Sequence, residues 1–270
     1  MDIYQELGVK KIINAAGNYT VIGASKMTEE TLKELCAAAK WNVEIEELQD
    51  KVHAKIAEMT HNESAFLCNS CSSAIYLATA ACVSLHYDRP LNLISKEEIR
   101  KCEMIALWGQ HLPYDRIIEQ LGVTLRFIGY PKMEAPMSGE EFKASINNNS
   151  IGCFFVSRTP DGYYGENCMN LSNFIEIAHA YRLPIIVDAA AQLPPKSNLW
   201  RFTQMGADIV CFSGGKDLAG PQASGLMLGR GEYMEEIRKV SFPRQSYGRF
   251  MKIGREEIIG LYSAIKQYMA

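Results

Sequence analysis

The sequence predicts an α/β fold in which helices cover both faces of a mostly parallel sheet. Short apolar runs typical of buried strands alternate along the chain with longer stretches that have apolar residues at helical spacing. The chain has 270 residues, of which 47% are hydrophobic and 22% charged, an ordinary composition for a globular protein. That length allows one large domain, or one domain together with part of a second.

The first half of the chain predicts helices on either side of short apolar strands. Leu48, Val52 and Ile56 recur at helical spacing and indicate a helix over 29–59, which we expect to break near Trp41. The elements expected after it are a strand over 64–67, an alanine-rich helix over 74–85, a strand over 100–107, a helix over 113–121 that ends at Gly122, and a strand over 124–129.

The second half continues the alternation and adds the only candidate boundary. The expected elements are a helix over 142–146, a strand over 151–156, a helix over 171–181, a strand over 184–187, a helix over 202–205, and strands over 208–212 and 223–228. Ser241-Phe242-Pro243 then interrupts the pattern before a final helical stretch over 255–269.

Composition excludes or weakens several function classes. No apolar run approaches the roughly 18 residues of a membrane helix, and the N-terminus lacks the basic and apolar segments of a secretory signal. The net charge is −3 with both signs interleaved, which weakens a nucleic-acid interpretation.

The cysteines favour unpaired thiols over a metal or redox site. Cys68 and Cys71 form a single C-x-x-C, without the second pair or the nearby histidines that zinc would need. Several others lie in apolar runs, where cysteine behaves as a small hydrophobic residue. The natural compartment for such a chain is the cytoplasm. The eight cysteines are at positions 36, 68, 71, 82, 102, 153, 168 and 211.

The most informative motif is Ser213-Gly214-Gly215-Lys216. It follows an apolar run over 208–212 and precedes a Gly220-Pro221 turn. The glycines let other atoms approach the backbone closely. A lysine that forms a Schiff base with an aldehyde cofactor needs such a restricted, partly desolvated position, which exposes its amine to one partner.

Asp188 closes the apolar run 184–187 and lies 28 residues before Lys216, with one helix expected between them. Alone, this acid could cap a turn, bind a metal or support a pyridinium nitrogen. In a βαβ unit, however, both residues fall at the carboxyl ends of strands, where such sheets bind ligands. The pairing favours a cofactor with an aldehyde carbon for the lysine and a ring nitrogen for the aspartate.

A third strand end carries the polar turn 68–73, Cys-Asn-Ser-Cys-Ser-Ser, which leads into a helix. Free N–H groups and the positive end of the helix dipole make such a turn a good phosphate site. Taken alone, the turn favours a plain helix cap, since serine and asparagine are preferred there.

These residues resemble the fold-type I pyridoxal-phosphate enzymes, and more narrowly the selenocysteine synthase-related family that includes D-glucosaminate-6-phosphate ammonia-lyases. The matching segments are INAAGNYT at 13–20, IEELQ at 45–49, VDAAAQLPP at 187–195, GAD at 206–208 and SGGKDLAGPQ at 213–222. They cover nearly the whole chain, and the last is the most specific. The turn at 69–72 departs from the family, whose phosphate turn is usually richer in glycine and alanine.

The resemblance implies the large domain of a pyridoxal-phosphate-dependent transferase fold, with pyridoxal 5'-phosphate as the cofactor and roles for particular residues. Lys216 would hold the aldehyde carbon and Asp188 the ring nitrogen, while His111 would stack on the ring; these three form the catalytic set. The phosphate would bind Ser70, Cys71, Ser72 and Ser213, with Gly220 near a neighbouring subunit's phosphate. Asn18, Tyr19 and Thr20 would face the substrate, with Arg158 and Arg244 as candidate anion contacts.

The reaction implied is α,β-elimination on an amino acid or a phosphorylated amino-sugar acid. Freed from the cofactor by the substrate's amino group, Lys216 would remove the α-proton, a β-hydroxyl or similar group would leave, and hydrolysis would release ammonia and an oxo acid. Two alternatives stay open: a selenium transferase acting on seryl-tRNA, and a non-catalytic protein that binds cofactor or a partner.

The resemblance also implies a domain division and an assembly. We expect a large cofactor-binding domain over 1–240 with an N-terminal arm, and a linker helix with the start of a small domain over 241–270. Relatives continue for on the order of a hundred residues more, as a second domain of ordinary size would. A homodimer or larger homo-oligomer is expected, with no membrane partner.

Overall fold

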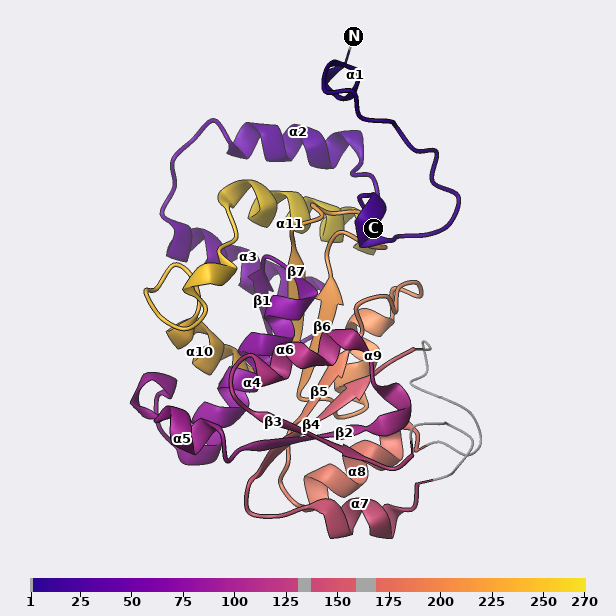
Figure 1. Ribbon diagram of the computed structural model, residues 1–270. Helices are drawn as coiled ribbons and strands as arrows, with labels where there is room; N and C mark the ends of the chain where they lie inside the picture. Colours follow the sequence, from indigo (N-terminus) through magenta and orange to yellow (C-terminus); the bar gives the residue numbers. More distant parts are fainter. Residues whose placement is uncertain (1, 131–136, 159–168) are drawn as a thin grey trace.

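The structure is a computed structural model that describes residues 2–130, 137–158 and 169–270, and a seven-stranded sheet forms its centre (Figure 1). The strand order is β1-β7-β6-β5-β4-β2-β3. The strands are β1 (Ser64–Cys68), β2 (Glu103–Leu107), β3 (Thr124–Ile128), β4 (Ser150–Val156), β5 (Ile185–Asp188), β6 (Ile209–Ser213) and β7 (Gly225–Gly229). Neighbouring strands from β3 to β6 are parallel, and only β7 runs antiparallel to its neighbours. The predicted α/β class is therefore confirmed.

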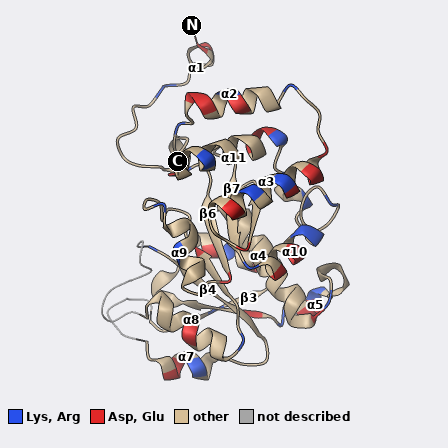
Figure 2. Cartoon of the chain, turned by 180° about the vertical axis from the view of Figure 1, so that it is seen from behind, with Lys and Arg blue, Asp and Glu red and all other residues tan. Residues whose placement is uncertain are grey.

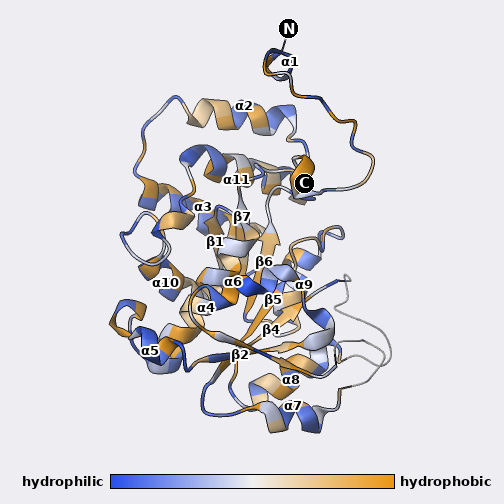
Figure 3. Ribbon diagram, viewed as in Figure 1, coloured by the Kyte–Doolittle hydropathy of each residue, from blue (hydrophilic) through white to orange (hydrophobic). Residues whose placement is uncertain are grey.

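Helices lie on both faces of the sheet and around its edges (Figure 1). They are α1 (Ile3–Glu6), α2 (Glu29–Ala38), α3 (Ile45–Met59), α4 (Cys71–Tyr87), α5 (Lys96–Ile99), α6 (Arg116–Glu119), α7 (Gly139–Ser145), α8 (Leu171–Ala180), α9 (Asn198–Gln204), α10 (Gly231–Val240) and α11 (Arg255–Met269). Figure 2 shows acidic and basic residues interspersed along the outer helices, and Figure 3 shows hydrophobic residues along the central strands and on parts of the helices.

Alternating side chains of the strands build two hydrophobic cores, one on each face. In β6, Ile209 and Cys211 join the core that α4, α6 and α10 cover, whereas Val210 and Phe212 join the core that α3, α8, α9 and α11 cover. This two-residue period follows from the pleat of a strand. Because both faces are covered, the strands are buried almost throughout, which explains why they appear in the sequence as continuous apolar runs.

Several element boundaries differ from the predictions. The expected helix over 29–59 is two helices, α2 and α3, separated at 39–44, so the predicted break near Trp41 is confirmed. The strand expected over 100–107 begins at Glu103, because Ser95 and Glu98 form a capping box that starts α5 just before it. Helix α10 was not predicted at all, and α4 begins at Cys71 rather than at residue 74.

The last helix packs onto the body of the protein. Helix α11 contacts α2 and α3, and its Leu261 side chain lies against the backbone of the loop that follows β6. The division of the chain at 240 stays a prediction. Across the described residues, no helix combines the length and the apolar character needed to cross a membrane.

The cysteines that the structure describes are free thiols, and most of them are buried in the cores. Burial raises the pKa of Cys68 to about 12 and raises those of Cys153 and Cys211 well above the ordinary value. The described residues contain no cluster of three or more His, Cys, Asp or Glu side chains suited to a metal ion. Cys168 lies outside the described residues.

Candidate active site

The carboxyl ends of β1, β5 and β6 meet at one edge of the sheet. Residues Cys68, Gly225 and Ser213 lie opposite one another across β1, β7 and β6, and Asp188 on β5 lies opposite Cys211 on β6. The three strand ends that sequence analysis selected are therefore neighbours in space. This is the edge at which parallel α/β sheets bind ligands.

Lys216 lies in a tight turn directly after β6, and the structure explains the two glycines before it. A Cβ at Gly214 would lie 2.2 Å from Ser224 Oγ, and a Cβ at Gly215 would lie 2.5 Å from the Cα of Gln222. The carbonyl of Gly215 also accepts hydrogen bonds from the backbone N–H (3.1 Å) and the hydroxyl (2.7 Å) of Ser25. Only glycine fits this loop, which holds the lysine at a fixed, half-buried position.

Asp188 ends β5 as a buried carboxylate of which one oxygen accepts hydrogen bonds. Its Oδ1 accepts the Ala190 N–H at 2.9 Å and the Cys71 thiol at 3.7 Å. In the described part of the chain no donor reaches Oδ2, which leaves that oxygen for a further donor. Burial raises the pKa of Asp188, while the Ala190 N–H and the nearby Lys216 charge oppose the rise. A protonated ring nitrogen would supply the donor and the positive charge that this oxygen lacks.

The amino end of α4 forms the third part of the site. Ser70 caps the helix, because its hydroxyl accepts the Ser73 N–H at 3.0 Å. The N–H groups of Cys71 and Ser72 have no intrahelical acceptor and lie at the positive end of the helix dipole. Ser213 lies two strands away in the same row as Cys68. This donor set suits a phosphate group.

Gly225 allows the α4 turn to lie directly on the sheet. A Cβ at position 225 would lie 2.4 Å from the carbonyl carbon and oxygen of Ser70 and 2.8 Å from the Cys71 nitrogen. Real Cβ atoms do not come so close to backbone, so any side chain here would push the helix start away from β6. The cradle between α4 and Ser213 therefore depends on this glycine.

Gly225→Ala should destabilise the cofactor-free protein by about 1–3 kcal/mol, because overpacking forces the backbone to shift. It should also weaken pyridoxal-phosphate binding, since Ser70 and Ser213 would separate. Urea unfolding and a cofactor titration measure the two effects. Gly139→Ala is the matched control, because its new Cβ would meet only the Ile177 side chain, at 3.2 Å. Unchanged cofactor affinity in Gly225→Ala would show that the cradle is not where phosphate binds.

His111 lies after β2 at the same edge of the sheet, oriented by a buried acid. Its Nδ1 is 2.9 Å from Asp115 Oδ2, and its ring meets Trp108 and Phe127 edge to face. The charge of Asp115 contributes to the raised pKa of Asp188, so this loop lies near the aspartate. Stacking of His111 on a cofactor ring stays a prediction.

The N-terminal arm reaches the lysine loop. Asn18 Nδ2 donates to Asp217 Oδ1 at 3.0 Å, and Gln222 Nε2 donates to the Thr20 carbonyl at 2.8 Å. Tyr19 lies between them with an exposed ring. Gly220 closes the other side of the loop, with its N–H donating to the Gly214 carbonyl at 2.9 Å. Substrate contact by the three arm residues stays a prediction.

The two arginines proposed as anion contacts lie in different surroundings. Arg158 is exposed and follows β4, so it lies at the same sheet edge as Asp188. Arg244 instead pairs with Glu46 at 2.8 Å and donates to the Arg238 carbonyl at 2.7 Å, beside α3 and α10. In the described chain, Arg244 lines a pocket that neither Lys216 nor Asp188 lines. The substrate roles of both arginines remain predictions.

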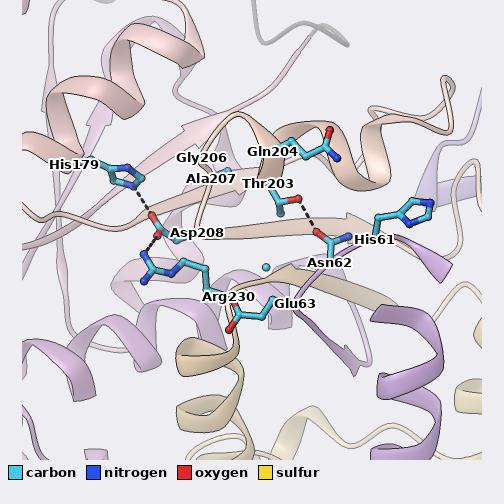
Figure 4. Close-up of a pocket in the computed structure, with 11 residues that line it drawn as sticks. His61, Asn62, Glu63, His179, Thr203, Gln204, Gly206, Ala207, Asp208 and Arg230 are labelled. Atoms are coloured by element: carbon cyan, nitrogen blue, oxygen red, sulfur yellow. Dashed lines mark hydrogen bonds and ion pairs between the residues drawn. The ribbon is translucent and has the colours of Figure 1, made fainter. Parts of the chain in front are cut away.

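A larger pocket of about 320 Å³ lies at the opposite edge of the sheet, where β1 and β6 begin (Figure 4). Asp208 is buried there between His179 at 2.9 Å and Arg230 at 3.1 Å, and Thr203 donates to Asn62 at 2.6 Å. Figure 4 shows these groups turned toward one another. They satisfy each other and serve the fold, since Asp208 also accepts the Ile185 N–H.

Comparison with known proteins identifies the family. The sequence pattern of the family described as "SelA: L-seryl-tRNA selenium transferase" matches residues 12–270. The chain belongs to this family. The resemblance drawn from the lysine loop is therefore confirmed.

The individual proteins that this chain resembles are named for different reactions. D-glucosaminate-6-phosphate ammonia lyase of Salmonella typhimurium is 29% identical over 99% of this chain and 70% of its own length. A 5'-C-glycyluridine monooxygenase-decarboxylase of Streptomyces is 27% identical over 99% of this chain and 65% of its own. L-seryl-tRNA(Sec) selenium transferase of Aquifex aeolicus is 24% identical over 96% of this chain and 58% of its own.

Solved structures agree on the fold. A structure of D-glucosaminate-6-phosphate ammonia-lyase matches 99% of this chain and 70% of its own with a TM-score of 0.87 and 28% identity. A sphingosine-1-phosphate lyase of Burkholderia pseudomallei matches with a TM-score of 0.63 at 12% identity, which shows the fold alone.

Selenium transferases and ammonia lyases of this kind are pyridoxal-phosphate enzymes, so the predicted cofactor and the prediction of an enzyme are confirmed. The residues present fit that cofactor. Lys216, Asp188 and the α4 start offer an amine, a carboxylate oxygen that accepts no donor among the described residues, and a cradle of N–H groups at one sheet edge. The role of each residue is an inference from this geometry.

Sequence reasoning missed two residues of the site, Gln110 and Asp217, and one contact of Cys71, which it had placed at the phosphate. The Cys71 thiol reaches Asp188 as well as starting α4. Gln110 is buried with its Oε1 accepting the Val156 N–H at 2.9 Å at the end of β4. Asp217, next to the lysine, holds the N-terminal arm through Asn18. Only Asp217 carried a signal, since it is adjacent to Lys216 within the matching segment.

Proposed function

We propose that the protein is a pyridoxal-phosphate-dependent lyase that releases ammonia by α,β-elimination from an amino acid or a phosphorylated amino-sugar acid. The observation that carries the proposal is the placement of Asp188 at the end of β5 and of Lys216 in the turn after the adjacent parallel strand β6, with the α4 start at the same edge. The similarity to an ammonia lyase across 99% of the chain supports this choice of reaction.

The cofactor, when bound, supplies an electron sink next to the substrate's α-carbon. Lys216 Nζ would hold the cofactor and, once freed by the substrate's amino group, would accept the α-proton and pass it to the leaving β-hydroxyl. Asp188 Oδ2 keeps a proton on the ring nitrogen. The β-hydroxyl leaves as water, and a second water replaces the amino group, so that the products are ammonia and a 2-oxo acid. His111, oriented by Asp115, would stack on the cofactor ring.

We further infer a cytoplasmic homo-oligomer. The N-terminal arm carries apolar side chains that a partner surface would cover, such as Ile13 and Val21, which are 98% and 93% exposed. The lysine loop and this arm touch, so a second copy that covers the arm would also lie near the site.

A selenium transferase acting on seryl-tRNA is the second candidate, because the family pattern carries that description. It shares the lysine chemistry but requires a surface for RNA. The net charge of −3 and the interspersed charges of Figure 2 favour a small-molecule substrate instead.

The test is an absorbance spectrum of the purified protein followed by a substrate screen. We expect a band near the visible edge from the lysine-bound cofactor. We then expect release of ammonia and oxo acid in a 1:1 ratio from a D- or L-amino acid or from a phosphorylated amino-sugar acid such as D-glucosaminate 6-phosphate.

Three outcomes contradict the proposal in different ways. Absence of the band after reconstitution would favour a non-catalytic protein. A band without ammonia release, together with binding of seryl-tRNA at moderate salt, would favour the transferase. A band with neither would restrict the function to cofactor binding.

A further inference from the structure

A pocket of about 130 Å³ lies between α3, the end of α10 and the segment that follows α10. Figure 1 shows this segment, in yellow, looping beside α3. Neither Lys216 nor Asp188 lines the pocket, so it is separate from the site described above and independent of the proposed function. Its interior is built from polar side chains of α3 and α10.

His53 presents a hydrogen-bond donor to this pocket. Its Nε2 accepts the Leu67 N–H at 3.0 Å, on the outer edge of β1, so the ring proton lies on Nδ1. Burial, with the nearby Arg238 charge, lowers the pKa of His53 to about 3, so the ring is neutral at pH 7. The side chain is 1% exposed, and Nδ1 has no acceptor among the described residues.

Three more buried polar atoms around the pocket have no hydrogen-bond partner in the described chain: Gln49 Nε2, Arg238 Nε and Ser241 Oγ. Gln49 and Ser241 are 5% and 3% exposed. Gln49 and His53 are four residues apart and share one face of α3. Buried donors without acceptors are rare in native proteins, and four around one pocket indicate a common acceptor.

The acidic residues of the pocket lie at its rim and are already paired. Glu46 pairs with Arg244 at 2.8 Å, and Asp50 lies 3.8 Å from Arg238; these acidic side chains are 46% and 69% exposed. Arg249 and Lys252 lie over the ring of Phe242, which also lines the pocket. The lining itself holds two acidic residues and two arginines, and Arg249 and Lys252 add positive charge beyond Phe242.

We propose that this pocket binds a small oxyanion, either a phosphate or a carboxylate group. The volume equals about four water molecules at about 30 Å³ each, which accommodates such a group. A ligand with several acceptor oxygens and a negative charge matches donors from Gln49, His53 and Ser241 together with the Arg238 guanidinium. A cation is disfavoured, because the buried atoms are mainly donors.

The test uses the full chain loaded with pyridoxal phosphate, so that the α4 cradle is already occupied. Inorganic phosphate and acetate are titrated separately at constant ionic strength by calorimetry. We expect saturable binding of one of them with a stoichiometry of one, and the anion that binds identifies the group. Gln49→Glu replaces an amide donor with a carboxylate of the same shape and should weaken binding about tenfold or more.

Two further variants and one spectroscopic measurement complete the test. Gln120→Glu makes the same chemical change at an exposed position of the chain and should bind like the wild type. Ser241→Ala removes one donor without changing charge and should weaken binding by about three- to tenfold. In the wild type, the anion should shift the His53 Nδ1 resonance, which gives a result even if Gln49→Glu fails to fold.

Absence of saturable binding would overturn the proposal and assign the pocket to a cluster of structural waters. Equal binding by Gln49→Glu, Ser241→Ala and Gln120→Glu, or an unmoved His53 resonance, would place the anion elsewhere on the protein. Either result would leave the lyase proposal unaffected, because Lys216, Asp188 and the α4 start do not line the pocket.

Discussion

Lys216→Ala should remove the absorbance band of the lysine-bound cofactor and reduce ammonia release by about 10²–10⁴-fold, the usual contribution of a positioned acid–base group. Lys216 supplies the amine of its loop. Neighbouring atoms approach Gly214 and Gly215 so closely that the turn has one conformation. Alanine keeps that backbone and removes only the nitrogen, so the effect is expected in chemistry rather than in folding. Absorbance spectra and an ammonia assay measure it.

Lys51→Ala is the matched control, because Lys51 is exposed on α3 and lies outside the lysine loop. It should retain both the band and the rate. An unchanged band in Lys216→Ala would reject Lys216 as the cofactor lysine. A lost band with an unchanged rate would separate cofactor attachment from proton transfer.

The fold could be predicted from the sequence because strands buried on both faces leave a signal that short windows can detect. The runs before Asp188 and before Ser213 became β5 and β6, adjacent and parallel, as a βαβ unit requires. Helix α10 was missed although Tyr233, Met234, Ile237 and Val240 are buried at helical spacing, because it begins at a glycine and Arg230 provides no side-chain cap. The start of α4 was misplaced because several residues of the polar turn could serve as its cap.

The site could be predicted only as far as strand order determines it. The pairing of Asp188 with Lys216 follows from two consecutive strands, so spacing alone indicated it. The contact of Asn18 with Asp217 spans 199 residues, and no local pattern encodes it. The pairing of Arg244 with Glu46 likewise depends on how the segment after α10 returns to α3. That return places Arg244 in a pocket outside the predicted site.

Asp188→Asn should reduce ammonia release by about 10²–10⁴-fold, because an amide cannot keep a proton on the cofactor's ring nitrogen. The replacement has the same shape, and its Oδ1 can still accept the Ala190 N–H that the carboxylate accepts at 2.9 Å. Cofactor affinity should also fall, since the ring nitrogen would lose its charged partner. The measurements are the ammonia assay and a cofactor titration, with a retained rate as the contradicting result.

The same substitution should stabilise the cofactor-free protein by about 0.5–2 kcal/mol at pH 7, as is common where a site is built for activity. Burial raises the pKa of Asp188 above its ordinary value of 3.8, which the unfolded chain keeps. Between these two pKa values the folded state binds more protons, so wild-type stability falls as pH rises through that window. The gain in the free energy of unfolding of Asp188→Asn over the wild type should therefore shrink as pH falls toward 3.8.

Urea unfolding at a series of pH values measures this difference, with Asp88→Asn, at an exposed helix end, as the control. A loss of stability at pH 7 would mean that the Lys216 charge, and not burial, dominates this carboxylate.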